Sequence, residues 1–254
     1  MSTSQIMTTD RESISPSTYT DVERGWINIK ECGHAGPTAG GAIPVLAQGH
    51  SFGRAGADNN NRIANPSPAG AISFAATALL LSLFNVHAGG VEHPEVVAVF
   101  TGGLSQFAAG MWEYPRGNAF NATLFSLYGS FWMSYATIFI PASGIVASYK
   151  NPAELSHALG LYLITWTVVT AFFLLVVIRR NVALTVMLAT IFVTLVMLSI
   201  SQYSLVETPV LYVRVQKTGG VFGIFGALLC FYIGMSELLA AELRPVVRLP
   251  LGVV

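Results

Sequence analysis

Charged side chains are scarce in this chain of 254 residues. Asp, Glu, Lys and Arg make up 10% of the sequence, against about 25% in an average soluble domain. Basic and acidic residues number 13 each, so the formal net charge is zero. A protein that binds nucleic acid needs a basic surface to neutralise phosphates. The composition therefore excludes a nucleic-acid partner.

Residues typical of metal, disulfide and nucleotide chemistry are also few. Cys32 and Cys230 are too few and too far apart for a disulfide scaffold. The five histidines show no ligand spacing, and there is no GxxxxGK[ST] phosphate loop. We therefore expect no metal, no cofactor and no ATP-driven pump. An intramembrane serine protease built on Ser143 is disfavoured, because the next histidine, His157, lies in the following loop and no later span carries a histidine that could act as the base. The protein is predicted not to be an enzyme.

Long stretches without charge are the main feature of the sequence. Six of them, 17 to 33 residues long, follow the first 62 residues: 63–91, 96–112, 117–149, 155–178, 181–206 and 218–236. A membrane-spanning helix needs roughly 17–25 mostly apolar residues. Only helices and closed barrels can span a bilayer, and these continuous apolar runs lack the alternation of barrel strands. The sequence therefore predicts an all-α membrane protein with six transmembrane helices.

The predicted spans lie near residues 69–88, 95–113, 121–141, 158–178, 182–200 and 218–238. A soluble protein with buried helices is the alternative. Six windows of this length in one chain argue against it.

The distribution of Lys and Arg around the spans predicts their orientation. One side of the membrane would hold seven of these residues: Arg54, Arg62, Arg116, Arg179, Arg180, Arg244 and Arg248. The other side would hold three: Lys150, Arg214 and Lys217. The richer side faces the cytoplasm, so both termini are predicted to be cytoplasmic. The chain ends without a peroxisomal signal, and we expect the plasma membrane.

Three regions follow from this pattern. Residues 1–64 are rich in Ser, Thr, Gly, Asn and Pro and are predicted to form a flexible cytoplasmic tail. Residues 65–240 form the six-helix membrane domain, and residues 241–254 a short cytoplasmic C-terminal tail.

Asn65 stands just before the first predicted span and is followed by Pro66. Asn is a good N-cap, and Pro is tolerated in the first turn because its missing N–H would have no partner there. The same helix start is alternatively an anion site, since the dipole attracts negative charge. Pro66 and Pro68 weaken that alternative because they remove N–H donors.

The end of the second predicted span combines small and polar residues. Gly103, Gln106, Gly110 and Glu113 share one helical face. Glycines at this spacing let helices pack closely. A carboxylate near the membrane is costly unless it meets water, a partner or a proton. Glu113 is therefore either a proton-carrying group or the partner of Arg116, and both interpretations stay open.

The third predicted span carries a stripe of hydroxyl groups. Its members are Thr123, Ser126, Ser130, Ser134 and Thr137. Small hydroxyl residues often serve only in helix packing. A stripe of this length is nevertheless costly in lipid, so we expect part of this helix to line a pore. The glycines that open the last predicted span are instead typical of close helix packing.

At these same residues the chain resembles the acetate uptake transporter family, which includes the bacterial succinate–acetate permease and fungal acetate and ammonia-export proteins. The family hallmark NPAPLGL corresponds here to NPSPAGA (65–71). The likeness continues through GGLSQFAAGMWEYPRGNAF (102–120), SLYGSFW (126–132), ALGLYL (158–163) and Trp166. It covers roughly residues 65–240 and leaves the N-terminal tail outside.

The resemblance implies secondary transport of small monocarboxylates, acetate above all, usually as proton-coupled symport. It also implies a hexamer in which every protomer has its own pathway. By position, Phe74, Tyr128 and Ile191 would form the constriction of that pathway. Family proteins carry Leu at the third position, so Ile191 changes the shape of the constriction. The hallmark differs at three positions, Ser67, Ala69 and Ala71.

The chemistry of acetate fits such a pathway. Acetate is ionised at neutral pH and crosses lipid poorly as the anion. A pathway needs donors weak enough to release it, and Asn65, Gln106, Ser130 and Tyr128 are the candidates. A passive acetate channel needs the same polar path as a symporter. An ammonium-export or acetate-signalling protein of the same architecture is a further alternative.

Overall fold

The computed structural model describes residues 63–90, 98–205 and 207–252. The chain divides into two units, 1–51 and 52–254. The first unit lies wholly outside the described residues, as does nearly all of the predicted tail 1–64. The second unit is described by itself below, and its described residues contain helices and no strand.

The N-terminal half of this unit has three long helical segments. Helix α2 covers Ser67–Asn85. The π-helix η3, Ala98–Ser105, continues directly into α4, Gln106–Glu113. Helix α5 follows at Ala119–Phe139. The single turns η2 (Ala88–Gly90), η4 (Pro141–Ser143) and α6 (Ile145–Ser148) lie in the connections.

The C-terminal half has three longer helices. They are α7 (Pro152–Val177), α8 (Val182–Ser204) and α9 (Pro209–Ala241). After α9, residues 242–252 fold back along the helices. In this segment the carbonyls of Leu251 and Gly252 accept hydrogen bonds from the N–H groups of Ala183 and Val182, at 3.1 and 2.9 Å.

Asparagine begins three of these helices. The side chains of Asn118, Asn151 and Asn181 accept hydrogen bonds from backbone N–H groups three residues ahead, at 3.4, 2.8 and 3.1 Å. Such N-caps satisfy N–H groups that have no partner inside the helix. Pro152 and Pro209 open α7 and α9, where a missing N–H costs nothing.

Each of the six predicted spans coincides with helix in the described residues, but the details differ. The second span is two consecutive pieces, η3 and α4, because π-helical turns occupy its first half. Helix α9 begins nine residues before the predicted boundary, so Arg214 and Lys217 lie on the helix. Four helices, α2, α7, α8 and α9, are long and apolar enough to cross a membrane. Helix α5 falls outside that group because its Ser, Thr, Tyr and Asn residues lower its mean hydropathy.

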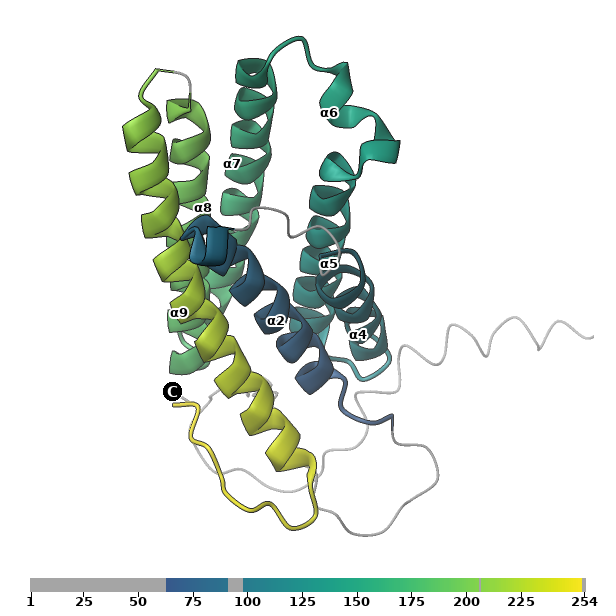
Figure 1. Cartoon of the computed structure of the whole chain (residues 1–254). Helices are drawn as coiled ribbons and strands as arrows, with labels where there is room; N and C mark the ends of the chain where they lie inside the picture. The colour runs from purple at the N-terminus through teal and green to yellow at the C-terminus, as the bar shows by residue number, and fades with distance from the viewer. Residues whose placement is uncertain (1–62, 91–97, 206, 253–254) are drawn as a thin grey trace, which may run out of the picture. The chain divides into compact units, whose positions relative to one another are not determined.

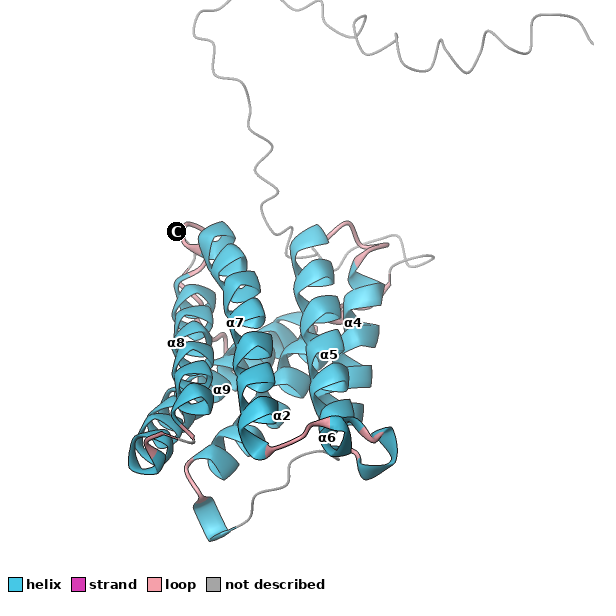
Figure 2. Ribbon diagram, turned by 90° about the horizontal axis from the view of Figure 1, so that it is seen from above, coloured by secondary structure: helices cyan, strands magenta, loops and turns pink. Residues whose placement is uncertain are grey.

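The helices form two groups joined by α2 (Figures 1 and 2). On one side α8 packs against α7 and α9, and on the other α5 packs against η3 and α4. Helix α2 lies between them and contacts α9 as well as η3 and α4. Two glycines bring α4 and α5 together: a Cβ on Gly110 would lie 2.6 Å from the backbone N of Ser126, and one on Gly129 2.6 Å from that of Phe107. Glycine is therefore required at both positions.

Candidate functional site

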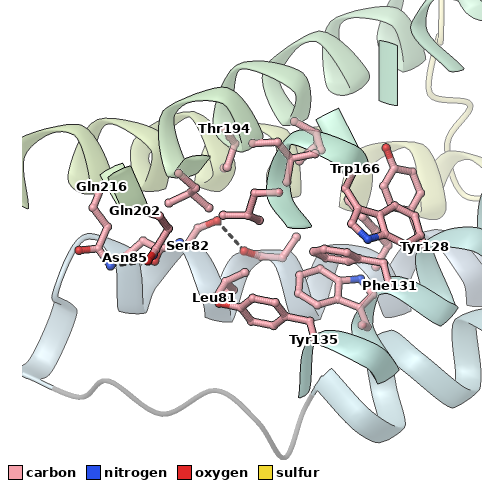
Figure 3. A pocket seen from close by; sticks show the side chains of 18 residues that line it. Leu81, Ser82, Asn85, Tyr128, Phe131, Tyr135, Trp166, Thr194, Gln202 and Gln216 are labelled. Carbon is pink, nitrogen blue, oxygen red and sulfur yellow. Dashed lines mark hydrogen bonds between the residues drawn. The ribbon is translucent and has the colours of Figure 1, made fainter. Parts of the chain in front are cut away.

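A pocket of about 90 Å³ lies between α2, α5, α7, α8 and α9 (Figure 3). One water needs about 10–15 Å³ measured this way, so the space holds several waters or a small solute. No Asp, Glu, Lys or Arg is among the described residues that line it. The pocket has an aromatic end and an amide end.

Six side chains make the aromatic end: Phe74, Tyr128, Phe131, Trp132, Trp166 and Ile191. All three residues expected at the constriction are among them. Phe74, Tyr128 and Ile191 are 5%, 2% and 6% exposed, and the rings of Phe74 and Tyr128 are centred 5.3 Å apart. The structure thus brings together one residue each from α2, α5 and α8. Close aromatic pairs such as this hold their rings in defined positions.

Tyr128 is fixed by its hydroxyl as well as by its ring. The hydroxyl lies 2.8 Å from Oγ1 of Thr170, and Thr170 donates its own proton to the carbonyl of Trp166 at 2.8 Å. Tyr128 is therefore the donor in this pair, and its proton is engaged. Its ring also stacks on that of Trp166, with the two ring centroids 6.3 Å apart. Tyr128 therefore serves as a rigid wall of the pocket rather than as a free hydrogen-bond donor.

The amide end is formed by Asn85, Gln202 and Gln216, from α2, α8 and α9. Nε2 of Gln216 donates to Oδ1 of Asn85 at 3.4 Å, and Oε1 of Gln202 accepts from Ser156 at 2.9 Å. None of the three was expected from the sequence. One signal was present, since Asn85 follows Phe74 by eleven residues, about three helical turns, and therefore lies on the same face.

The hydroxyl stripe of α5 does not line this pocket. Ser130 donates to the carbonyl of Ser126 at 2.9 Å, and Thr123 and Thr137 donate to carbonyls four residues back. Serine and threonine satisfy themselves in this way inside helices. All five residues of the stripe are half-buried or exposed. The face of α5 that lines the pocket is its aromatic face instead. Gln106, expected beside the pathway, is fully buried outside the pocket, and no described residue bonds its side chain.

Asn65 and Glu113 both bond Ser67 and Arg116, at the opposite end of α2 from Asn85. Oδ1 of Asn65 accepts from the N–H of Ser67 at 3.1 Å and from Arg116 at 2.5 Å. Asn65, expected as the N-cap, lies one residue before the N-cap Pro66 and satisfies the N–H of the first helical residue, Ser67. Arg116 also bonds the fully buried carboxylate of Glu113 at 3.0 Å, so the ion pair is formed. Glu113 accepts a second hydrogen bond from the Ser67 hydroxyl.

Two further side chains complete this polar cluster. Nδ2 of Asn121 donates to Ser67 at 3.0 Å, and Glu237 of α9 interacts with both Ser67 and Glu113. Arg116 and Ser67 stabilise the buried carboxylate of Glu113, whereas the nearby carboxyl of Glu237 repels it. Glu237 was not expected here from the sequence, because it is more than 100 residues from Glu113.

Comparison with known proteins identifies the family. Residues 51–250 match the model of the GPR1/FUN34/yaaH family. The chain belongs to this family. The resemblance drawn from the sequence motifs is thereby confirmed.

Several members of the GPR1/FUN34/yaaH family have names that describe transport. Acetate permease A of Emericella nidulans is 31% identical over 69% of this chain and 61% of its own length. Ammonia transport outward protein 2 of Saccharomyces cerevisiae is 35% identical over 68% of this chain and 60% of its own length. Meiotically up-regulated gene 86 protein of Schizosaccharomyces pombe is 41% identical over 75% of this chain and 66% of its own length. The chain thus spans just under two thirds of the length of these relatives.

A solved structure of the same architecture exists. The structure of the bacterial acetate channel SatP is similar, with a TM-score of 0.64 and 28% identity, and covers 74% of this chain and 99% of its own. Together with the apolar helices, this likeness makes the chain a multi-pass membrane protein.

Replacing Thr170 by Val should destabilise the protein. The buried hydroxyl of Tyr128 would lose its acceptor, and an unsatisfied buried polar group costs about 1–3 kcal/mol. Thermal unfolding in detergent should show a lower midpoint. Thr165→Val is the matched control, because the exposed Thr165 bonds only the carbonyl of Leu161 on its own helix. Equal midpoints for the two variants would contradict a structural role for the Tyr128–Thr170 bond.

Proposed function

We propose that the protein transports acetate and related small monocarboxylates across the membrane through the pocket between α2, α5, α7, α8 and α9. One observation carries the proposal: Phe74, Tyr128 and Ile191 converge on a pocket that no described charged residue lines. An uncharged path with neutral donors binds a carboxylate weakly enough to release it. The names of relatives that describe acetate transport support the same substrate.

We propose that the protein has six membrane spans and works as a hexamer with one pathway in each protomer. Four helices meet the length and hydropathy of a span by themselves. The consecutive η3 and α4 supply a fifth span, and α5, about 32 Å long at about 1.5 Å per residue, supplies the sixth. An even number of spans puts both termini on one side, which we propose is the cytoplasmic side of the plasma membrane.

Proton-coupled symport is the proposed mode of transport. Glu113 is the candidate for the coupling proton, because it is a fully buried carboxylate at one end of α2, close to Glu237. The ion pair with Arg116 supports the alternative in which Glu113 is only the partner of Arg116 at the membrane interface.

Two other modes have support of their own. A passive acetate channel is favoured by the likeness to the bacterial acetate channel SatP. Export of ammonium is favoured by the name of a yeast relative, and a neutral amine suits a path without charge.

Uptake of labelled acetate by purified protein in liposomes tests the function. Accumulation above equilibrium that follows an inward proton gradient and collapses with an uncoupler supports symport. Rapid equilibration without accumulation supports the channel. No acetate flux from folded protein would contradict both, and uptake of labelled methylammonium would then test the ammonium alternative.

Phe74→Ala and Tyr128→Ala should each raise the uptake of butyrate relative to acetate. Removing a ring widens the aromatic end of the pocket, so a longer acid passes. The ratio of the two initial uptake rates measures the effect. Phe172→Ala is the control, because Phe172 is 64% exposed on α7 and does not line the pocket. An unchanged ratio in both pocket variants would remove this end of the pocket from the pathway.

Glu113→Gln should flatten the rise of acetate uptake as the outside becomes more acidic. The amide keeps the size of the side chain and its bond to Ser67 but carries no titrating proton. Initial rates between pH 5 and 8 measure the effect, with Glu154→Gln at the exposed start of α7 as the control. An unchanged pH profile in folded Glu113→Gln protein would favour the structural ion pair.

A further inference from the structure

The amide end of the pocket contains a buried hydrogen-bond donor without a protein partner. Asn85 is 8% exposed and lines the pocket, and no described residue bonds its Nδ2. Figure 3 shows Asn85 beside Gln216 and Gln202, at the end of the pocket away from Tyr128 and Trp166. Buried amide groups in proteins are nearly always hydrogen-bonded. A donor left open toward a cavity therefore calls for an acceptor inside that cavity.

Neighbouring groups explain why Asn85 presents its nitrogen rather than its oxygen. Gln216 donates through Nε2 to Oδ1 of Asn85, which leaves only Nδ2 of Asn85 open. The other side-chain atom of Gln216, Oε1, lies 3.4 Å from Nε2 of His87. With the His87 proton on Nε2, His87 donates to Oε1 and both ends of the Gln216 amide are occupied. Turning Asn85 over would set its oxygen toward the pocket and break the bond from Gln216.

The hydroxyl groups beside Asn85 do not compete for the same ligand. Ser82 donates to the carbonyl of Ala78 at 2.6 Å, and Thr194 donates to that of Thr190 at 2.9 Å. Their protons are used within their own helices. Two lining residues carry a buried donor that no described residue bonds, Trp132 through Nε1 at the aromatic end and Asn85 through Nδ2 at the amide end. Asn85 Nδ2 is therefore the buried donor that remains for a solute at the amide end.

We propose that Nδ2 of Asn85 binds the carboxylate group of the transported acid, and that Gln216 is the positioning residue that keeps this donor turned toward the pocket. The proposal rests on the proposed function in that the solute is a carboxylate. The acid would lie with its carboxylate at the amide end and its alkyl group toward the aromatic end. An N–H group bonds a carboxylate more strongly than a neutral acceptor. An amide also lacks the full charge that would hold the anion too tightly for passage.

Asn85→Asp tests the donor with almost no change in shape. The variant replaces the N–H₂ group by a carboxylate oxygen, which repels the substrate. In liposomes containing the full chain, the acetate concentration for half-maximal uptake should rise about tenfold or more. Asn151→Asp is the matched control: it makes the same substitution at the exposed start of α7, where Asp caps as well as Asn. Asn85→Leu, which keeps the volume without a donor, provides a second variant if the Asp variant does not fold.

Gln216→Leu tests the positioning role. Loss of the bond to Asn85 frees that amide to turn, so the half-saturating concentration should rise about threefold while the maximal rate stays unchanged. A merely structural role would lower the maximal rate or the folded yield instead, and that result would overturn the role of Gln216.

A binding measurement separates this inference from the proposed function. The thermal midpoint of purified protein is compared in acetate and in chloride at equal ionic strength. Stabilisation of the wild type but not of Asn85→Asp by acetate supports the site, whether or not flux is seen. Normal wild-type transport with unchanged half-saturation in both Asn85 variants overturns the site and leaves the function standing. Neither flux nor stabilisation of the wild type overturns both.

Discussion

Lipid supplies no hydrogen bonds, so the chain must satisfy its own polar groups, and the fold of the described residues follows from this constraint. Asparagine side chains cap the starts of three helices, and prolines stand where an N–H would have no partner. Hydroxyl groups along α5 bond to carbonyls of the preceding turn. Glu113, the costliest group to bury, is met by Arg116 and Ser67. The few polar side chains left unpaired therefore stand out against a background in which nearly everything is matched.

The same constraint shapes the pocket. A cation inside the pocket would trap an anion, whereas a wholly apolar pocket would exclude it. The structure combines aromatic walls, fixed by ring contacts and by the bond from Tyr128 to Thr170, with neutral amides at the other end. In our proposal, selection by size and recognition of the carboxylate belong to different ends of one cavity.

Much of the fold was predictable because the spacing of charges reflects the thickness of the bilayer directly. The positions of the six helical segments follow from that spacing, and the family resemblance implied Phe74, Tyr128 and Ile191 by position. Which face of α5 lines the pocket was not predictable. A stripe of hydroxyl groups predicts a water-lined face only if the hydroxyl protons are free. Local bonding to the helix backbone removes that requirement. The π-helical turns of η3 also left no pattern in the charge spacing.

The site residues that the sequence did not predict were missed for one common reason. Asn85, Gln202 and Gln216 come from three helices, and single amides near helix ends look like ordinary boundary residues until the helices are packed. Glu237 reaches Glu113 only because α9 crosses α2, a contact that no local pattern records. The sequence indicates which side chains are costly to bury, while only the packing shows which of them meet.

The folded-back C-terminal segment has a consequence of its own. Leu251 and Gly252 supply acceptors to the first N–H groups of α8, and Leu249 and Pro250 accept hydrogen bonds from Ser236 and Tyr232 of α9. Residues 249–252 therefore link α8 and α9 through hydrogen bonds, and α8 carries Ile191. A tag or a partner that pulls these residues away would loosen one wall of the pocket without touching any residue that lines it.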